Sequence, residues 1–251
     1  MIKVLVVVLS LIAKYLPVSL VVLEPVIFLI FEPSIGKSAR KKPARKLVNW
    51  EVLNYLYTKR QIDRELITRF SLGCSISGQQ IGITDNNRIY DFFSEKQLII
   101  PLANKEGEIV AFAGRKIDGG ASGAAQTKYK YLPSSQYYRK SSLLYNYSVV
   151  KKSRATECYL VEGFFDVISL TKIGVENCLA LLGTNLSEEQ TKLLQELKKR
   201  IILFLDSDKA GQEATINISL RLLSHEIDCE VVKGDYQGDP DEICQQNEPK
   251  T

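Results

Sequence analysis

The feature that most constrains the fold of this chain is an alternation of short apolar runs with helical stretches between residues 158 and 232. The apolar runs, which have the length of buried strands, are residues 158–161, 178–181, 201–205 and 229–232. The stretches with helical spacing are residues 166–173, 187–199 and 210–224, and in the last of these Ile216, Leu220, Leu223 and Ile227 share one face. Buried strands joined by helices form a parallel sheet with right-handed crossovers. The pattern therefore predicts an α/β domain with helices on both faces of the sheet.

Acidic residues follow three of the four predicted strands. Glu162 comes directly after the first strand, Asp206 and Asp208 follow the third, and Asp239 and Asp241 follow the fourth. Because ligands of parallel sheets bind at the carboxyl ends of the strands, these side chains are expected to share one edge. Each acid by itself has a plain structural explanation, as a turn residue or a helix N-cap. Three acidic clusters at three strand ends favour a common function instead.

Carboxylates that converge on one edge repel one another unless a cation lies between them. The alternate spacing of D-x-D directs both side chains to the same side of an extended backbone. Oxygen ligands without a nearby histidine or cysteine favour Mg²⁺ or Mn²⁺ over zinc. Such a site is typical of phosphoryl transfer, in which one or two metal ions bring the attacking and leaving oxygens into line.

The composition bears on three other features: a zinc site, disulfide bonds and a nucleic-acid-binding surface. The five cysteines form no C-x-x-C pair and the only histidine is His225, so neither a zinc site nor a disulfide framework is predicted. Unpaired cysteines in apolar runs are typical of a cytoplasmic protein. The formal charge of +4 is only mildly basic, but residues 115–154 contain nine lysines and arginines against one acid, interleaved with tyrosines. Such a stretch either binds a nucleic acid or forms a solvated face with its tyrosines packed on the core.

Upstream of the alternating region, the predicted structure is mixed. Residues 49–73 have helical spacing, whereas residues 97–101 and 108–114 are apolar runs joined by a turn at residues 104–107. This combination predicts a β-hairpin preceded by short helices. Residues 119–126 are small and are expected to form a loop.

The motifs E-G-x-x-D at 162–166, D-x-D-x-A-G at 206–211 and G-D-P-D at 238–241 resemble the Toprim domain. Their combination is similar to the catalytic core of bacterial DnaG-type DNA primases. Further blocks resemble that core in the same order, at residues 98–115, 130–135, 138–146 and 179–184. The resemblance covers roughly residues 50 to 246. It implies a Toprim-type parallel sheet flanked by helices at 155–246, preceded by a small mixed α+β subdomain at 49–154.

By this resemblance the chain would synthesise short RNA primers on single-stranded DNA from ribonucleoside triphosphates, with Mg²⁺ or Mn²⁺ and no zinc as cofactor. Glu162 would be a metal ligand or general base. The other implied metal ligands are Asp206, Asp208, Asp239 and Asp241. Asp166 would support these ligands without binding the metal itself. The residues that would hold nucleotide phosphates or the template are Arg115, Lys130 and Lys140.

The resemblance does not include the zinc-binding module or the helicase-binding domain that such primases carry, so helicase contact through this chain is not expected. Two alternatives stay open. One is a different Toprim enzyme, such as a nuclease or a topoisomerase-like component. The other is a truncated, inactive primase fragment that only binds nucleic acid.

Residues 1–48 form an apolar segment followed by a basic linker, in which residues 34–47 carry six basic side chains and no acid. The apolar segment has three interpretations: a membrane anchor, a buried hairpin, or a non-native start created by truncation or a reading-frame error. We expect it to be dispensable for the catalytic fold and not to span a membrane. Lys14 and Glu24 would each cost about 2.5 to 3.5 kcal/mol at the centre of a bilayer.

Overall fold

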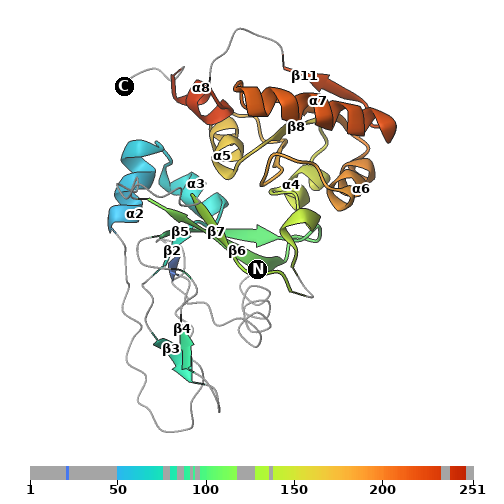
Figure 1. Cartoon of the computed structure of the whole chain (residues 1–251). Coiled ribbons are helices and arrows are strands. Elements are labelled where there is room, and N and C mark those ends of the chain that lie inside the picture. Colours follow the sequence, from blue (N-terminus) through green and yellow to red (C-terminus); the bar gives the residue numbers. More distant parts are fainter. Residues whose placement is uncertain are drawn as a thin grey trace. The chain divides into compact units, whose positions relative to one another are not determined.

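The computed structural model divides the chain into two compact units (Figure 1). Unit 1 comprises Met1–Pro101 and Ile109–Leu132, and unit 2 comprises Leu102–Glu108 and Pro133–Thr251. The residues that the structure describes are 21–22, 50–75, 80–83, 88–90, 93, 97–117, 128–135, 138–232 and 238–246. The domain boundary that the sequence predicts between residues 154 and 155 stays a prediction.

Unit 2 contains a four-stranded parallel sheet with the strand order β11-β10-β8-β9. Its strands are β8 (Glu157–Val161), β9 (Cys178–Ala180), β10 (Arg200–Leu203) and β11 (Cys229–Val231). The register places Leu160 of β8 between Leu203 of β10 and Leu179 of β9. All four strands fall on the predicted apolar runs, so the predicted α/β fold with a parallel sheet is confirmed.

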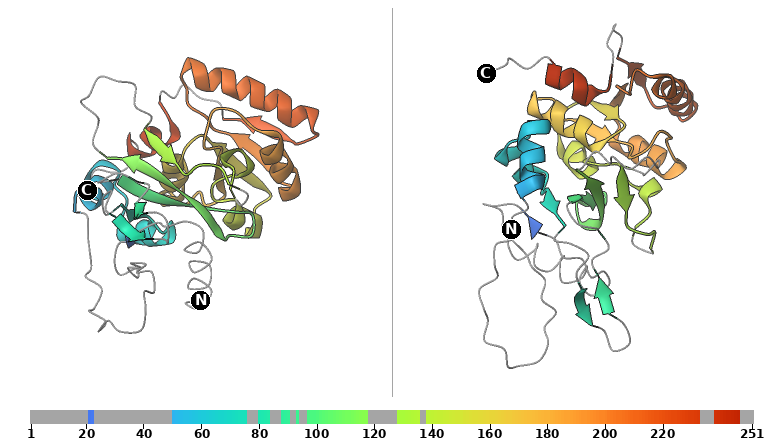
Figure 2. Two further views of the ribbon diagram at one scale, coloured as in Figure 1. Left: turned by 60° about the horizontal axis from the view of Figure 1, so that its bottom comes forward. Right: turned by 60° about the vertical axis from the view of Figure 1, so that its left-hand side comes forward.

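Right-handed crossovers between parallel strands place helices on both faces of such a sheet. The helices of unit 2 are η2 (Lys140–Ser142), α4 (Tyr147–Lys152), α5 (Phe164–Lys172), α6 (Glu188–Leu197), α7 (Lys209–Ser224) and α8 (Pro240–Gln246). Along the sheet, the connection from β8 to β9 runs in one direction, and the connections from β9 to β10 and from β10 to β11 run in the other. Helix α5 therefore packs with α8 on one face, and α6 and α7 cover the other (Figure 2).

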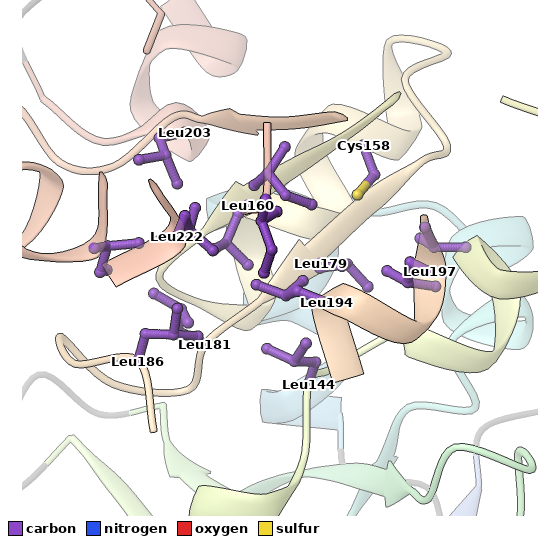
Figure 3. Close-up of a cluster of buried hydrophobic side chains, with 14 of the residues drawn as sticks. Leu144, Cys158, Leu160, Leu179, Leu181, Leu186, Leu194, Leu197, Leu203 and Leu222 are labelled. Atoms are coloured by element: carbon purple, nitrogen blue, oxygen red, sulfur yellow. The ribbon is translucent and has the colours of Figure 1, made fainter. Parts of the chain in front are cut away.

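Leucines dominate the core between the sheet and the α6–α7 layer. Figure 3 shows side chains of α6 and α7 gathered around Leu160, including Leu194 and Leu222, all of which are fully buried. Burying one such side chain contributes about 1.5 to 3 kcal/mol. This layer holds β8 and β10, the strands that lead into the acidic segments, against α6 and α7.

The apolar face predicted for α7 is not the face that packs on the sheet, although Ile227, which follows the helix, is buried as part of the core. Ile216, Leu220 and Leu223 are 60–62% exposed, whereas Ala214, Ile218 and Leu222 face the core. Aliphatic residues occur on more than one face of this helix, so helical spacing alone does not show which face is buried. The buried stripe begins at Gly211, where an added Cβ would overlap the carbonyl oxygen of Asp206. Close approach at the first turn therefore orients the helix.

Unit 1 is built on a five-stranded sheet with the order β1-β2-β5-β6-β7. Its strands are β1 (Val21–Val22), β2 (Gly73–Cys74), β5 (Gln97–Ala103), β6 (Ile109–Lys116) and β7 (Tyr129–Tyr131). The remaining elements of the unit are α2 (Trp50–Asn54), η1 (Tyr55–Lys59), α3 (Arg64–Arg69), β3 (Gln80–Ile83) and β4 (Arg88–Tyr90). The predicted hairpin is confirmed as β5 and β6. The turn between them, which belongs with the end of β5 to unit 2, has the Gly107 amide donating to the Asn104 carbonyl.

Most of the amino-terminal segment lies outside the described residues. The described part of it, β1, pairs antiparallel with β2. The predicted loop at 119–126 also lies outside them. Within the ranges that the structure describes, no helix has both the length and the apolar character needed to cross a membrane. The expectations for residues 1–48 stay predictions.

Tyr138 offers a test of packing in unit 2, because it is 3% exposed and its hydroxyl has no hydrogen-bond partner among the described residues. Burial also raises the pKa of this hydroxyl to about 12. A buried polar group without a partner costs about 1 to 3 kcal/mol. We therefore expect Tyr138→Phe to raise the free energy of unfolding, measured in urea, by about 1 kcal/mol.

Tyr147 is the matched control for this substitution. It is 2% exposed, but its hydroxyl donates to the Leu193 carbonyl at 3.1 Å. Tyr147→Phe should therefore lower the free energy of unfolding by about 1 kcal/mol. Changes of the same sign in both variants would contradict the interpretation of the Tyr138 hydroxyl.

Candidate metal site

The acidic residues of unit 2 lie at the carboxyl edge of the parallel sheet. Glu162 directly follows β8, and Asp206 comes three residues after the end of β10. These two strands are neighbours, and the connections that leave them run in opposite directions along the sheet. Such a switch point is where α/β sheets bind their ligands.

Glu162 stands in a strongly negative environment. Its Oε1 atom is buried and accepts no hydrogen bond from any described residue. Burial raises the pKa of this carboxyl to about 7, and the negative charges of Asp206, Asp208 and Asp239 act in the same direction. A hydrogen bond from the backbone amide of Asp206 opposes the rise. Three further acids are therefore close enough to Glu162 to act on its charge.

The D-x-D segment both begins a helix and carries carboxylate oxygens at the edge of the sheet. Asp208 is the N-cap of α7, because its Oδ1 accepts a hydrogen bond from the Gly211 amide at 2.7 Å. Its Oδ2 takes part in none of the hydrogen bonds formed within the described ranges. The capping explanation and the ligand explanation for this residue are therefore compatible, since each needs one oxygen.

The third acidic segment leads into α8. Asp239 Oδ1 accepts from the Glu242 amide at 2.7 Å, which leaves its other oxygen for a different partner. Asp241 is 1% exposed, and its Oδ1 accepts from the Ser169 hydroxyl at 2.5 Å and from Gln245 Nε2 at 2.8 Å. The two acids of G-D-P-D therefore have different surroundings.

Asp166 supports the turn that follows Glu162. Its Oδ2 accepts a hydrogen bond from the Gly163 amide at 2.7 Å, and the side chain is 5% exposed. Burial raises the pKa of the Asp166 carboxyl to about 8, aided by the charges of Asp239, Asp206 and Asp241 and opposed by the Gly163 bond. The residue contacts the backbone one position after Glu162.

Sequence reasoning missed Ser207, the middle residue of D-x-D. Its hydroxyl accepts a hydrogen bond from the Gly238 amide at 2.8 Å, and its own amide donates to the Gly238 carbonyl at 3.2 Å. These two bonds join the second acidic segment to the third. The middle position of D-x-D carries no sequence signal for such a contact.

The predicted phosphate-binding residues fall in both units. Lys140 belongs to unit 2, where its Nζ lies 3.9 Å from the position that a Cβ on Gly183 would take, in the loop after β9. Arg115 belongs to unit 1, is 5% exposed, and donates to the Tyr129 hydroxyl at 2.5 Å. Lys130, also in unit 1, is exposed on β7 opposite Gly114.

The donor set fits a hard divalent cation. As the side chains stand, no three Asp, Glu, His or Cys residues in the described ranges converge closely enough to hold one ion. The available donors are nevertheless carboxylate oxygens, and the buried Glu162 Oε1 lacks a hydrogen-bond donor. Mg²⁺ and Mn²⁺ prefer such ligands, and their positive charge would offset the burial and the repulsion that raise the pKa of Glu162.

Comparison with known proteins gives two family matches, to the Toprim-like family over residues 159–244 and to the N-terminal domain of the DNA primase catalytic core over residues 75–151. A DNA primase of Staphylococcus aureus is 35% identical over 160 residues, which are 63% of this chain and 26% of that protein. A DNA primase of Rickettsia bellii is 33% identical over 222 residues, covering 78% of this chain and 36% of the relative.

A solved structure agrees with these matches. The zinc-binding and RNA polymerase domains of the Aquifex aeolicus primase align with a TM-score of 0.67 at 26% identity. The alignment covers 79% of this chain and 53% of the solved one. The chain thus spans about a quarter to a third of the length of the curated relatives it matches.

Proposed function

The chain belongs, through its catalytic core, to the bacterial DnaG-type DNA primases, and on that premise we propose that it joins ribonucleotides into short RNA primers on a single-stranded DNA template. The observation that carries this proposal is the placement of Glu162, with its buried and unbonded oxygen, beside Asp206 at the switch point of the sheet. The similar structure of the Aquifex aeolicus primase includes an RNA polymerase domain, which agrees with this proposal.

The carboxylates have different roles in the site. Asp206, Asp208 and Asp239 supply oxygens to hold one or two Mg²⁺ or Mn²⁺ ions, without a role for zinc. A bound ion supplies neutralisation of phosphate charge and alignment of the attacking and leaving oxygens. Glu162 either completes the ligand set or accepts the proton of the attacking hydroxyl, for which its pKa of about 7 is well matched. Asp166 keeps Glu162 in place through the Gly163 amide.

The basic residues bind the reactants. Lys140, beside the loop after β9, contacts the nucleotide triphosphate, and Arg115 with Lys130 contacts nucleotide or template phosphates. Cationic side chains of this kind account for most of the affinity for a nucleic-acid backbone. A cytoplasmic location follows from this function, because the template and the ribonucleotides are there.

The direct test is to incubate the purified chain with single-stranded DNA, labelled ribonucleoside triphosphates and Mg²⁺. The expected product is short RNA whose synthesis stops when EDTA is added. Shortened DNA in place of RNA would identify a nuclease. DNA binding without any product would identify a binding fragment. Either result would overturn the proposal.

Metal binding can be tested separately from activity. Replacing Asp206 and Asp208 together by asparagine keeps the shape of both side chains but removes two charges. Loss of a residue that only hydrogen-bonds to a metal ligand already lowers metal affinity about 10- to 100-fold. We therefore expect the double variant, which loses two proposed ligands, to bind Mn²⁺ more than about 10-fold more weakly than the parent by calorimetry. Asp228→Asn, at an exposed position just before β11, is the control and should bind as the parent does.

A further inference from the structure

The position of Asp239 depends on contacts that reach it from elsewhere in unit 2. Residues 233–237, which precede its segment, lie outside the described residues. Asp239 itself bonds only to the start of α8 among the described contacts, and the contacts with other elements lie on either side of it. One involves Gly238, immediately before it, and the other involves Asp241, two residues after it.

The contact before Asp239 is the pair of hydrogen bonds between Ser207 and Gly238. The Gly238 backbone has φ of +101°, and an added Cβ there would overlap the side chain of Glu242. Glycine is therefore required at this position. This conformation allows the Gly238 amide to reach the Ser207 hydroxyl at 2.8 Å while the Gly238 carbonyl accepts from the Ser207 amide. Of these two bonds, only the one to the hydroxyl depends on the identity of residue 207.

The contact after Asp239 is made by Ser169 on α5. Its hydroxyl donates to Asp241 Oδ1 at 2.5 Å in a region where Ser169 is 3% exposed and Asp241 is 1% exposed. Gln245 Nε2 donates to the same oxygen from within α8. A buried, charge-assisted bond of this kind is stronger than a neutral one. It fixes the first turn of α8 on α5, and with it the segment that carries Asp239.

We propose that Ser207 and Ser169 are positioning residues that hold Asp239 at the metal site. Ser207 aligns the segment with D-x-D, and Ser169 anchors it to α5 through Asp241. Asp241 thereby acts as an anchor in place of the ligand role expected from the sequence. The inference rests on the proposed function, because it assumes that Asp239 binds the metal.

The test measures Mn²⁺ affinity of the full chain by calorimetry in Ser207→Ala, Ser207→Thr, Asp239→Asn and the Ser207→Ala/Asp239→Asn double variant. Ser207→Ala is expected to weaken binding about 10-fold, as loss of a residue that orients a metal ligand does. Ser207→Thr, which keeps a hydroxyl, should restore binding. In the Asp239→Asn background, Ser207→Ala should have no further effect, because the residue acts through Asp239.

Ser169→Ala extends the test to the second anchor and is also expected to weaken Mn²⁺ binding about 10-fold, with the effect again absent in the Asp239→Asn background. Ser224→Ala is the matched control, because the Ser224 hydroxyl bonds only within its own helix end and should leave affinity unchanged. Hydrogen exchange supplies a readout that needs no metal. The Gly238 amide should exchange faster in Ser207→Ala than in the parent chain.

The outcomes separate this inference from the proposed function. A parent chain that binds no Mn²⁺ would overturn the metal site and the inference together. A parent chain that binds Mn²⁺, with affinity unchanged in Ser207→Ala and Ser169→Ala, would overturn the inference alone. Equal weakening in the presence and absence of the Asp239 carboxylate would do the same, because the serines would then act on the fold in general.

Discussion

Glu162→Gln is expected to lower the rate of ribonucleotide incorporation by about 10²- to 10⁴-fold while the protein stays folded. The amide has nearly the shape of the carboxylate, but it neither accepts a proton nor binds a divalent ion with a full charge. The measurement is primer synthesis on single-stranded DNA at saturating ribonucleotides. Glu213→Gln, at an exposed position on α7, is the control and should retain the parental rate.

The stability of the metal-free protein distinguishes this loss of activity from misfolding. The pKa of Glu162 is raised to about 7 from an ordinary value of 4.5. The stabilisation by the protonated form is therefore complete below pH 4.5 and is lost as the pH rises through 7. Glutamine has no such loss, so Glu162→Gln should unfold with a higher free energy than the parent at pH 8 in EDTA. At pH 4 the two proteins should differ little.

A variant that was less stable than the parent at pH 8 would contradict this account of Glu162. It would mean that the ionised carboxylate makes a favourable contact that outweighs its burial and the charges of Asp206, Asp208 and Asp239. An active variant that was more stable than the parent at pH 8 would instead remove Glu162 from the catalytic machinery and leave the fold as described.

The strands of unit 2 could be predicted because an apolar run reports burial directly. The limit of that signal is visible after β10, where the apolar run continues to Leu205 but the strand ends at Leu203. Leu205 is 2% exposed, so it is buried without belonging to the sheet. Burial and strand hydrogen bonding are separate properties, and the sequence pattern reports only the first.

The acids of the candidate site could be predicted because each stands at a strand end, but their partners could not. Ser207 bonds to a residue 31 positions away, and Ser169 to one 72 positions away. No local spacing encodes such contacts. They arise only when the crossovers bring α5, the D-x-D segment and α8 to one edge of the sheet. The different surroundings of Asp239 and Asp241 could not be predicted for the same reason.

Gly211 connects the fold to the site, and Gly211→Ala is expected to destabilise the protein by about 3 kcal/mol or more. Two effects compete in this substitution. Alanine in place of glycine inside an exposed helix ordinarily stabilises it by about 1 kcal/mol. Here the added methyl group would overlap the carbonyl oxygen of Asp206, which is backbone and cannot rotate away. Steric overlap therefore outweighs helix propensity, and the substitution lowers the free energy of unfolding.

The displacement caused by that methyl group would also reach the metal site, since Asp206 and the N-cap residue Asp208 lie on the segment that must move. Urea unfolding measures the first effect, and Mn²⁺ calorimetry of the folded variant measures the second, expected as a loss of about 10-fold or more. Gly183→Ala is the control, because an added Cβ there meets only Lys140 Nζ, at 3.9 Å, and stability should change by less than about 0.5 kcal/mol. If Gly211→Ala instead raised the free energy of unfolding, the gain in helix propensity would outweigh the steric overlap. Helix α7 would then not approach Asp206 as closely as the buried stripe of this helix requires.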